Sequence, residues 1–212
     1  MDKTQLAAPE LETVDVTGST RSAFLLRGAL ATGALLGGSA VSPFVGRALA
    51  QETGGDADIL NFALTLEYLE AAFYDRAVGK GRGMSSETRS LARELRDNET
   101  AHVDALKETI KRLGAKPVRA PTVGFGDVFT SERTFLKLAQ TLEDTGVSAY
   151  NGAAPQIKSS EVLGAAGSIV QVEARHAALI RLMRGQDPAP DAFDAALDKQ
   201  QVLDAVMPFV RS

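Results

Sequence analysis

The chain has 212 residues, of which 44% are hydrophobic and 24% charged, proportions typical of one soluble globular domain with a sizeable core. A formal net charge of −4, with no basic patch or tail, argues against a nucleic-acid partner. Cysteine is absent, which excludes disulfides, iron–sulfur clusters, cysteine-ligated zinc and thiol nucleophiles.

The first fifty residues are typical of an export signal. Arg21 and Arg27 precede the Gly/Ala-rich apolar run GALATGALLGGSAV, and the sequence ALA then offers an A-x-A cleavage site before Gln51. A membrane anchor is the alternative, but the run is short and diluted with glycine for a spanning helix. We therefore expect residues 1–50 to be removed and residues 51–212 to form the mature protein.

The export route is left open by the same segment. The stretch TRSAFLLRG resembles a twin-arginine (Tat) signal, but Ser22 stands where the second arginine is expected, so the general secretory (Sec) route is the alternative. Either route places the mature protein in a bacterial periplasm, with no membrane contact after cleavage.

Residues 51–212 are predicted to be helical throughout. Apolar residues recur at helical spacing in four long segments, each ended by a glycine or a proline. The segments are about 57–78 before Gly79, about 86–113 before Gly114, about 132–153 before Pro155, and about 160–184 before Gly185. Ser85, Ser131 and Ser159 precede the last three segments and are candidate N-caps.

The lengths of the connections predict the topology. Short connections join the first two and the last two segments, as in antiparallel neighbours, whereas the Pro/Gly-rich middle connection of about 17 residues is long enough to run the length of a bundle. We expect an all-α, up-down-down-up four-helix bundle with this crossover between helices 2 and 3. The stretch DKQQVLDAVMPFV predicts a short C-terminal helix packed on the outside.

Each predicted helix carries one glutamate at the middle of its core-facing seam, and no seam contains Lys or Arg. These glutamates are Glu67, Glu99, Glu143 and Glu173. The only two histidines, His102 and His176, each stand three residues after a seam glutamate, which puts both side chains of a pair on one helix face.

If these four glutamates are buried, their negative charges must be neutralised. Burying one uncompensated carboxylate costs several kcal/mol, so four of them would exceed the ~5–15 kcal/mol stability of a whole domain. Two divalent ions would balance four carboxylates, and the two imidazoles would complete a set of nitrogen and oxygen ligands. The sequence therefore predicts a dinuclear metal site; the alternative is a metal-free bundle with the Glu-x-x-His pairs on helix surfaces.

An internal repeat supports the choice of ligands. Glu67 and Tyr74 are seven residues apart, as are Glu143 and Tyr150, so two similar helical hairpins are expected to face each other across a pseudo-twofold axis. This symmetry favours Glu67 over Glu70 as the first-helix ligand, with Glu70 kept as the alternative.

Four segments carry a resemblance to a known family: LNFALTLEYLEAAFYDRAV, NETAHVDALK, LEDTGVSAYNGAAP and VEARHAALI. Together they resemble the ferritin-like superfamily, and most of all its exported bacterial ferritin-like domain proteins, over essentially all of the mature chain. The family uses one Glu from each of two helices and Glu-x-x-His from each of the other two to hold two metal ions. The resemblance implies bridging roles for Glu99 and Glu173, terminal roles for Glu67 and Glu143, and one ion each for His102 and His176.

Tyr74 matches the tyrosine beside the di-iron centre of ferritins and bacterioferritins. The resemblance therefore implies that Tyr74 hydrogen-bonds a terminal ligand or supplies an electron. A plain core role with a satisfied hydroxyl is the alternative for both Tyr74 and Tyr150.

The expected function is that of an exported oxidoreductase with two Fe ions, or alternatively two Mn ions. It would react with O2 or peroxide in the manner of a ferroxidase or a peroxide-consuming enzyme, in oxidative or metal stress. Absence of cysteine excludes a fused rubredoxin-type electron donor. A non-catalytic metal-binding or stress-protective bundle is the alternative, and a homodimer is compatible with either function.

Overall fold

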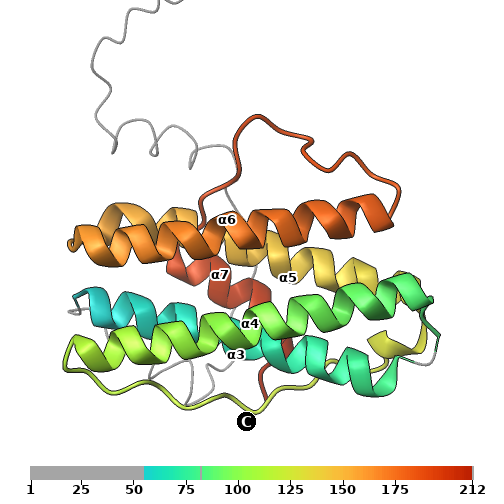
Figure 1. Ribbon diagram of the computed structural model, residues 1–212, viewed down its shortest axis with the longest axis horizontal. Helices are drawn as coiled ribbons and strands as arrows, with labels where there is room; N and C mark the ends of the chain where they lie inside the picture. Colours follow the sequence, from blue (N-terminus) through green and yellow to red (C-terminus); the bar gives the residue numbers. More distant parts are fainter. Residues whose placement is uncertain (1–54, 82, 212) are drawn as a thin grey trace, which may run out of the picture. The chain divides into compact units, whose positions relative to one another are not determined.

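Four long helices form a bundle in the computed structural model, which describes residues 55–81 and 83–211 (Figure 1). With the labels of Figure 1, they are α3 Asp56–Lys80, α4 Ser86–Arg112, α5 Glu132–Ala153 and α6 Ser160–Met183. The expected export segment and the expected mature start at Gln51 lie outside the described residues. None of the helices described is long and apolar enough to cross a membrane.

The topology is up-down-down-up, as predicted. Helix α3 packs mainly against α4 and α5 mainly against α6, so the bundle consists of two antiparallel hairpins. Residues 115–131 run the length of the bundle and connect the hairpins (Figure 1). Three short 3-10 turns are also present: Val128–Thr130 just before α5, Ala154–Gln156 just after it, and Met207–Phe209 near the C-terminus.

Local sequence signals account for most helix ends. The side chains of Ser85, Ser131 and Ser159 each accept a hydrogen bond from the backbone N–H three residues later, which confirms the three predicted N-caps. Gly114 and Gly185 adopt positive φ angles of 76° and 69° and end α4 and α6.

The end of α3 differs from the prediction. The helix continues through Gly79 and ends at Lys80, and its last backbone contact is the Gly81 N–H donating to the Ala77 carbonyl at 2.8 Å. A Cβ at Gly81 would lie 2.6 Å from that same carbonyl oxygen, whereas a Cβ at Gly79 would meet nothing. The glycine that the turn requires is therefore Gly81.

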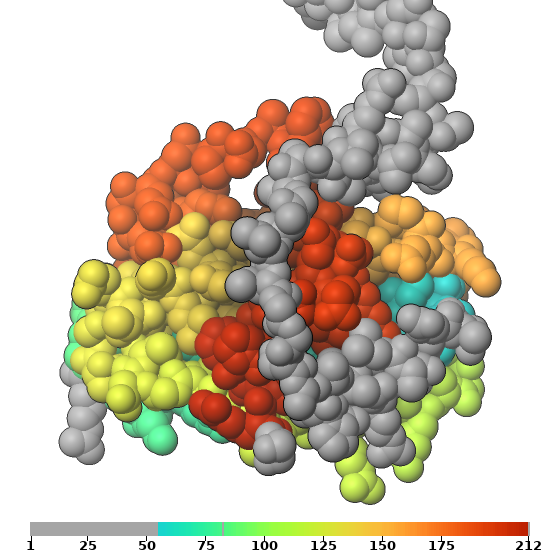
Figure 2. All heavy atoms as spheres, turned by 180° about the vertical axis from the view of Figure 1, so that it is seen from behind, coloured from blue at the N-terminus to red at the C-terminus, as the bar shows by residue number. Residues whose placement is uncertain are grey.

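The predicted C-terminal helix is α7, Lys199–Val206, which begins with a capping box formed by Asp198 and Gln201. It buries Val202 and packs against α5. Figure 2 shows the C-terminal segment in red beside the yellow residues of α5. Beyond α7, an antiparallel β-bridge joins Val210 to Val123 in the crossover, so the chain end also holds the connection between the hairpins.

The core consists of two apolar clusters separated by a polar layer. One cluster contains Leu60, Leu64, Leu106 and Ile110 near the start of α3 and the end of α4, and the other surrounds Phe73 near the end of α3. The Phe73 ring stacks on Phe135 with centroids 5.3 Å apart. The middle of all four helices lies between these clusters, where the seam glutamates occur.

One close approach fixes the segment before α7 against α5. The carbonyl oxygen of Leu197 lies 1.8 Å from the position that a Cβ on Gly152 would occupy, and the Leu197 N–H donates to the Ser148 carbonyl at 3.0 Å. Any side chain at residue 152 must displace this backbone.

Gly152→Ala is therefore expected to destabilise the protein by about 1–3 kcal/mol through overpacking. Gly164→Ala is the matched control, because Gly164 is an exposed helical glycine whose Cβ would meet nothing, so alanine should stabilise α6 by about 0.5–1 kcal/mol. Urea unfolding of both variants measures the difference. Equal midpoints for the two variants would contradict the assigned contact.

Candidate metal centre

The six side chains singled out from the sequence converge in the polar layer between the helices. They form two overlapping groups, in each of which the potential ligand atoms lie within 4.8 Å of one another. One group is Glu67, Glu99, His102 and Glu173, and the other is Glu99, Glu143, Glu173 and His176. Glu99 and Glu173 belong to both groups, which is the arrangement that two bridging carboxylates require.

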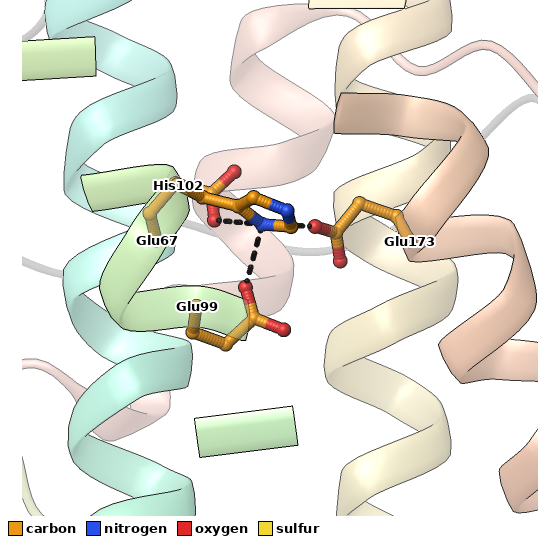
Figure 3. Close-up of side chains that lie close together, drawn as sticks. All are labelled: Glu67, Glu99, His102 and Glu173. Atoms are coloured by element: carbon orange, nitrogen blue, oxygen red, sulfur yellow. Dashed lines mark hydrogen bonds and ion pairs between the residues drawn. The ribbon is translucent and has the colours of Figure 1, made fainter. Parts of the chain in front are cut away.

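The first group surrounds the Nδ1 atom of His102, as Figure 3 shows. This nitrogen lies 2.8 Å from Oε1 of Glu173, 3.1 Å from Oε2 of Glu99 and 3.2 Å from Oε2 of Glu67. Helices α3, α4 and α6 thus each place a carboxylate oxygen near this imidazole nitrogen, which itself belongs to α4.

The second group surrounds Nδ1 of His176 in the same way. Oε1 of Glu99 lies 2.9 Å away, Oε2 of Glu143 3.3 Å and Oε2 of Glu173 3.6 Å. The two imidazole rings are 6.2 Å apart between centroids. Each shared glutamate therefore turns one oxygen toward each histidine.

Burial and hydrogen bonding both indicate a ligand set. All four glutamates are 0% exposed, and His176 is 2% exposed. Five buried atoms in the layer lack a hydrogen-bond partner among the described residues, despite lying close to one another: Glu99 Oε1, Glu143 Oε2, both oxygens of Glu173 and Nδ1 of His176. Buried polar atoms without partners are rare in proteins. Atoms that bind the same cation lie close together in this way without forming hydrogen bonds to one another. The residues present therefore fit two metal ions.

Two tyrosines fix the terminal carboxylates crosswise. The Tyr74 hydroxyl on α3 donates to Oε1 of Glu143 on α5, and the Tyr150 hydroxyl on α5 donates to Oε1 of Glu67 on α3 at 2.5 Å. Each phenol leaves the second oxygen of its carboxylate directed at a histidine. Both tyrosines thus orient a potential ligand, and the internal repeat seen in the sequence is a structural symmetry.

The imidazoles are strongly basic in this layer. Burial lowers the pKa of His102, but contacts with Glu173, Glu67 and Glu99 outweigh burial and raise the pKa to about 12. Burial likewise opposes charge on His176, and contacts with Glu143, Glu173 and Glu99 raise its pKa to about 12.

The carboxylates respond in opposite directions. Burial, together with the charge of Glu173, raises the pKa of Glu67 well above its usual value. Burial also raises the pKa of Glu143. Burial opposes charge on Glu173 as well, but contacts with His102 and His176 bring its pKa down to about 2. Protons and metal ions thus compete for the same atoms, and metal binding must release protons.

Two further polar residues lie at the layer, of which Asn98 was not predicted from the sequence. Asn98 places Nδ2 3.0 Å from Nε2 of His176, behind the ring nitrogen that faces the carboxylates. Glu70, treated as the alternative to Glu67, is itself buried at 3% exposure, so α3 carries two buried glutamates. Asn98 directly precedes Glu99, and that adjacency is the one signal that could have pointed to it.

Comparison with known families agrees with the fold. A model of the ferritin-like domain family matches residues 55–186, which is more than half of the chain. The chain belongs to the ferritin-like domain family. A search of curated proteins found no match.

The raised imidazole pKa values predict how stability depends on pH in chelator-treated protein. A histidine whose folded pKa exceeds its unfolded value of about 6.5 stabilises the fold fully below that pH, and this stabilisation is lost as pH rises toward the folded value. The raised pKa values of Glu67 and Glu143 act in the same direction. We expect the free energy of unfolding in EDTA, measured by urea unfolding, to fall between pH 6.5 and pH 9. Each imidazole should contribute at most about 1.4 kcal/mol per pH unit to this fall.

The double variant His102→Gln/His176→Gln is the control: it removes both imidazoles, so any fall that remains belongs to the buried carboxylates, and the difference between the two profiles is the histidine contribution. A wild-type midpoint that rises or stays constant over this range would show that the imidazoles are not protonated in the folded chain.

Proposed function

We propose that this chain is an exported dinuclear metal-binding protein, and that its two ions are iron, with manganese as the alternative. We further propose that it is an oxidoreductase that oxidises Fe(II) or consumes peroxide in oxidative or metal stress. The observation that carries the proposal is the set of buried, unpartnered oxygen and nitrogen atoms in two groups that share Glu99 and Glu173.

The charge of the layer favours two ions over one. The four glutamates of the two groups contribute −4 when ionised, and two divalent ions bring +4, so these six residues with neutral imidazoles are balanced before any contribution from Glu70. Glu99 and Glu173 would each bind both ions, Glu67 with His102 would complete one ligand set, and Glu143 with His176 the other. Carboxylate and imidazole ligands suit iron and manganese and do not distinguish between them.

Side chains around the ligands have supporting roles. Tyr74 and Tyr150 hold the terminal carboxylates in one orientation. Asn98, which places Nδ2 beside Nε2 of His176, would accept the Nε2 proton once Nδ1 binds an ion only with its amide turned over, so that the side-chain oxygen replaces Nδ2. When bound, two iron or manganese ions would supply redox chemistry with O2 or peroxide. Tyr74, fully buried beside Glu143, is also the side chain that we propose as an electron donor.

Substrates for this layer must be small. The six residues line neither of two surface hollows of about 350 Å³ and 330 Å³, and their most exposed side chain, His102, is only 11% exposed. Ions, O2 and hydrogen peroxide fit this restriction, whereas a bulky organic substrate does not.

We expect the purified chain to bind two Fe(II) or Mn(II) ions and to be stabilised by them, because an ion that binds only the folded state adds to its stability. Glu173→Ala and His176→Ala should lower the metal content measured by elemental analysis. Glu161→Ala on the same helix is the control, because Glu161 has an 82% exposed side chain.

Rapid mixing of the Fe(II)-loaded chain with O2 or hydrogen peroxide should give oxidation much faster than free Fe(II), saturating near two irons per chain. Glu99→Ala, which lacks a shared carboxylate, should lose the fast phase. If instead the Mn-loaded chain evolves O2 from peroxide, the protein is catalase-like. If neither form outpaces the free metal, the chain is a metal-binding or protective protein without turnover.

We also propose that the protein is exported to a bacterial periplasm, since residues 1–50 carry the features of a signal and a cleavage site. The intact mass of periplasmic material should correspond to a chain beginning at or close to Gln51. Material that retains residues 1–50 would contradict the proposal, and loss of export in Arg21→Lys would identify the Tat route.

A further inference from the structure

The pseudo-twofold symmetry of the layer is broken on helices α3 and α5. Helix α3 contains LEYLEAAFY and α5 contains LEDTGVSAY, so Glu67 corresponds to Glu143 and Tyr74 to Tyr150. In the same alignment Glu70 corresponds to Gly146. One hairpin thus presents an additional carboxylate where the other has no side chain at all.

Glu70 occupies the space that Gly146 leaves. A Cβ at Gly146 would lie 3.1 Å and 3.7 Å from the two carboxylate oxygens of Glu70. Oε2 of Glu173 lies 3.8 Å from the same point, so Gly146 adjoins both carboxylates, although Glu70 belongs to neither group of atoms that lie within 4.8 Å of one another and would have to turn toward an ion to bind it. Any larger residue at 146 would force the Glu70 carboxylate to move.

The Glu70 carboxylate lacks a partner where it lies. The residue is 3% exposed, and within residues 55–81 and 83–211 no hydrogen bond or ion pair joins its carboxylate to another side chain, although its oxygens are not among the five fully buried atoms that lack a partner. A packed structural glutamate is usually buried with a donor, since leaving a carboxylate without one costs several kcal/mol. The unpartnered group points instead to a cation that it shares with Glu173.

The positions of Glu173 and Gly146 show which of the two groups Glu70 lies nearer. Glu173 turns Oε1 toward His102 at 2.8 Å and Oε2 toward His176 at 3.6 Å. The oxygen near Gly146 is Oε2, and Gly146 lies one helical turn after Glu143 on α5. Glu70 therefore lies on the side of the layer where Glu143 and His176 meet.

We propose that Glu70 is a seventh ligand of the metal centre, that it binds the ion held by Glu143 and His176, and that Gly146 is the residue that admits it. The inference rests on the dinuclear centre proposed above. Its consequence is that the two metal positions are unequal. A site with one more carboxylate binds a hard divalent cation more tightly, so the position beside His176 fills first.

The test is a titration of chelator-treated protein with Mn(II), with free Mn(II) followed by electron paramagnetic resonance. Wild-type protein should bind two ions in two steps whose dissociation constants differ at least tenfold. Glu70→Gln, which keeps the shape of the side chain, should weaken the tight step at least tenfold and leave the weak step within about threefold of wild type. Glu161→Gln is the exposed control and should reproduce the wild-type curve.

Gly146→Ala provides an independent variant, since its Cβ would displace Glu70 without changing any charge. It should weaken the tight step in the wild-type background and have little effect in Glu70→Gln. Far-UV circular dichroism in EDTA checks that each variant is folded, and metal-free Glu70→Gln should unfold at higher urea than wild type because it lacks a buried carboxylate.

The outcomes separate the two proposals. Wild-type protein that binds no Mn(II) would overturn the metal centre itself. Wild-type protein that binds two ions while Glu70→Gln and Gly146→Ala give unchanged curves would overturn only the role of Glu70. Equal weakening of both steps in Glu70→Gln would also overturn it, because a side chain that only supports the packing does not discriminate between the two positions.

Discussion

Neutralisation of buried carboxylates is the constraint on which this bundle depends. Five glutamates lie in its middle layer at 3% exposure or less, and among the described residues two imidazoles contact four of them, Glu70 being the exception. Each unneutralised charge would cost several kcal/mol, a large fraction of the stability of a domain. The layer is therefore stable only with protons or metal ions in it, and the two apolar clusters on either side keep water from taking that role.

Helix α3 is the element that the constraint shapes most. It packs against α4 and α5 and contacts the 3-10 turn at Val128–Thr130, so it is buried over most of its circumference. A helix covered in this way has room for Glu67 on one side of its inner face and Glu70 on another. The C-terminal segment contributes indirectly, since its β-bridge to the crossover keeps the connection against the bundle.

Sequence reasoning predicted what depends on local chemistry and helical period. Serine caps, positive-φ glycines and the glutamate in the middle of each seam are signals of this kind, and the four helices followed from them. The apolar period does not guarantee burial at the helix ends, where Leu113 and Met183 are 43% and 37% exposed. Asn98 was missed, and Glu70 was kept only as an alternative to Glu67, because the surroundings of both residues depend on a neighbouring helix.

The crossed tyrosines bear on the order in which the chain folds. Each phenol holds a carboxylate of the opposite hairpin, so neither hairpin alone contains an oriented terminal ligand. The shared carboxylates are divided in the same way, one on α4 and one on α6. Both hairpins can form from local contacts, but the centre comes into existence only when they dock. A cation that occupies it would therefore stabilise the docked pair of hairpins and would not stabilise either hairpin alone.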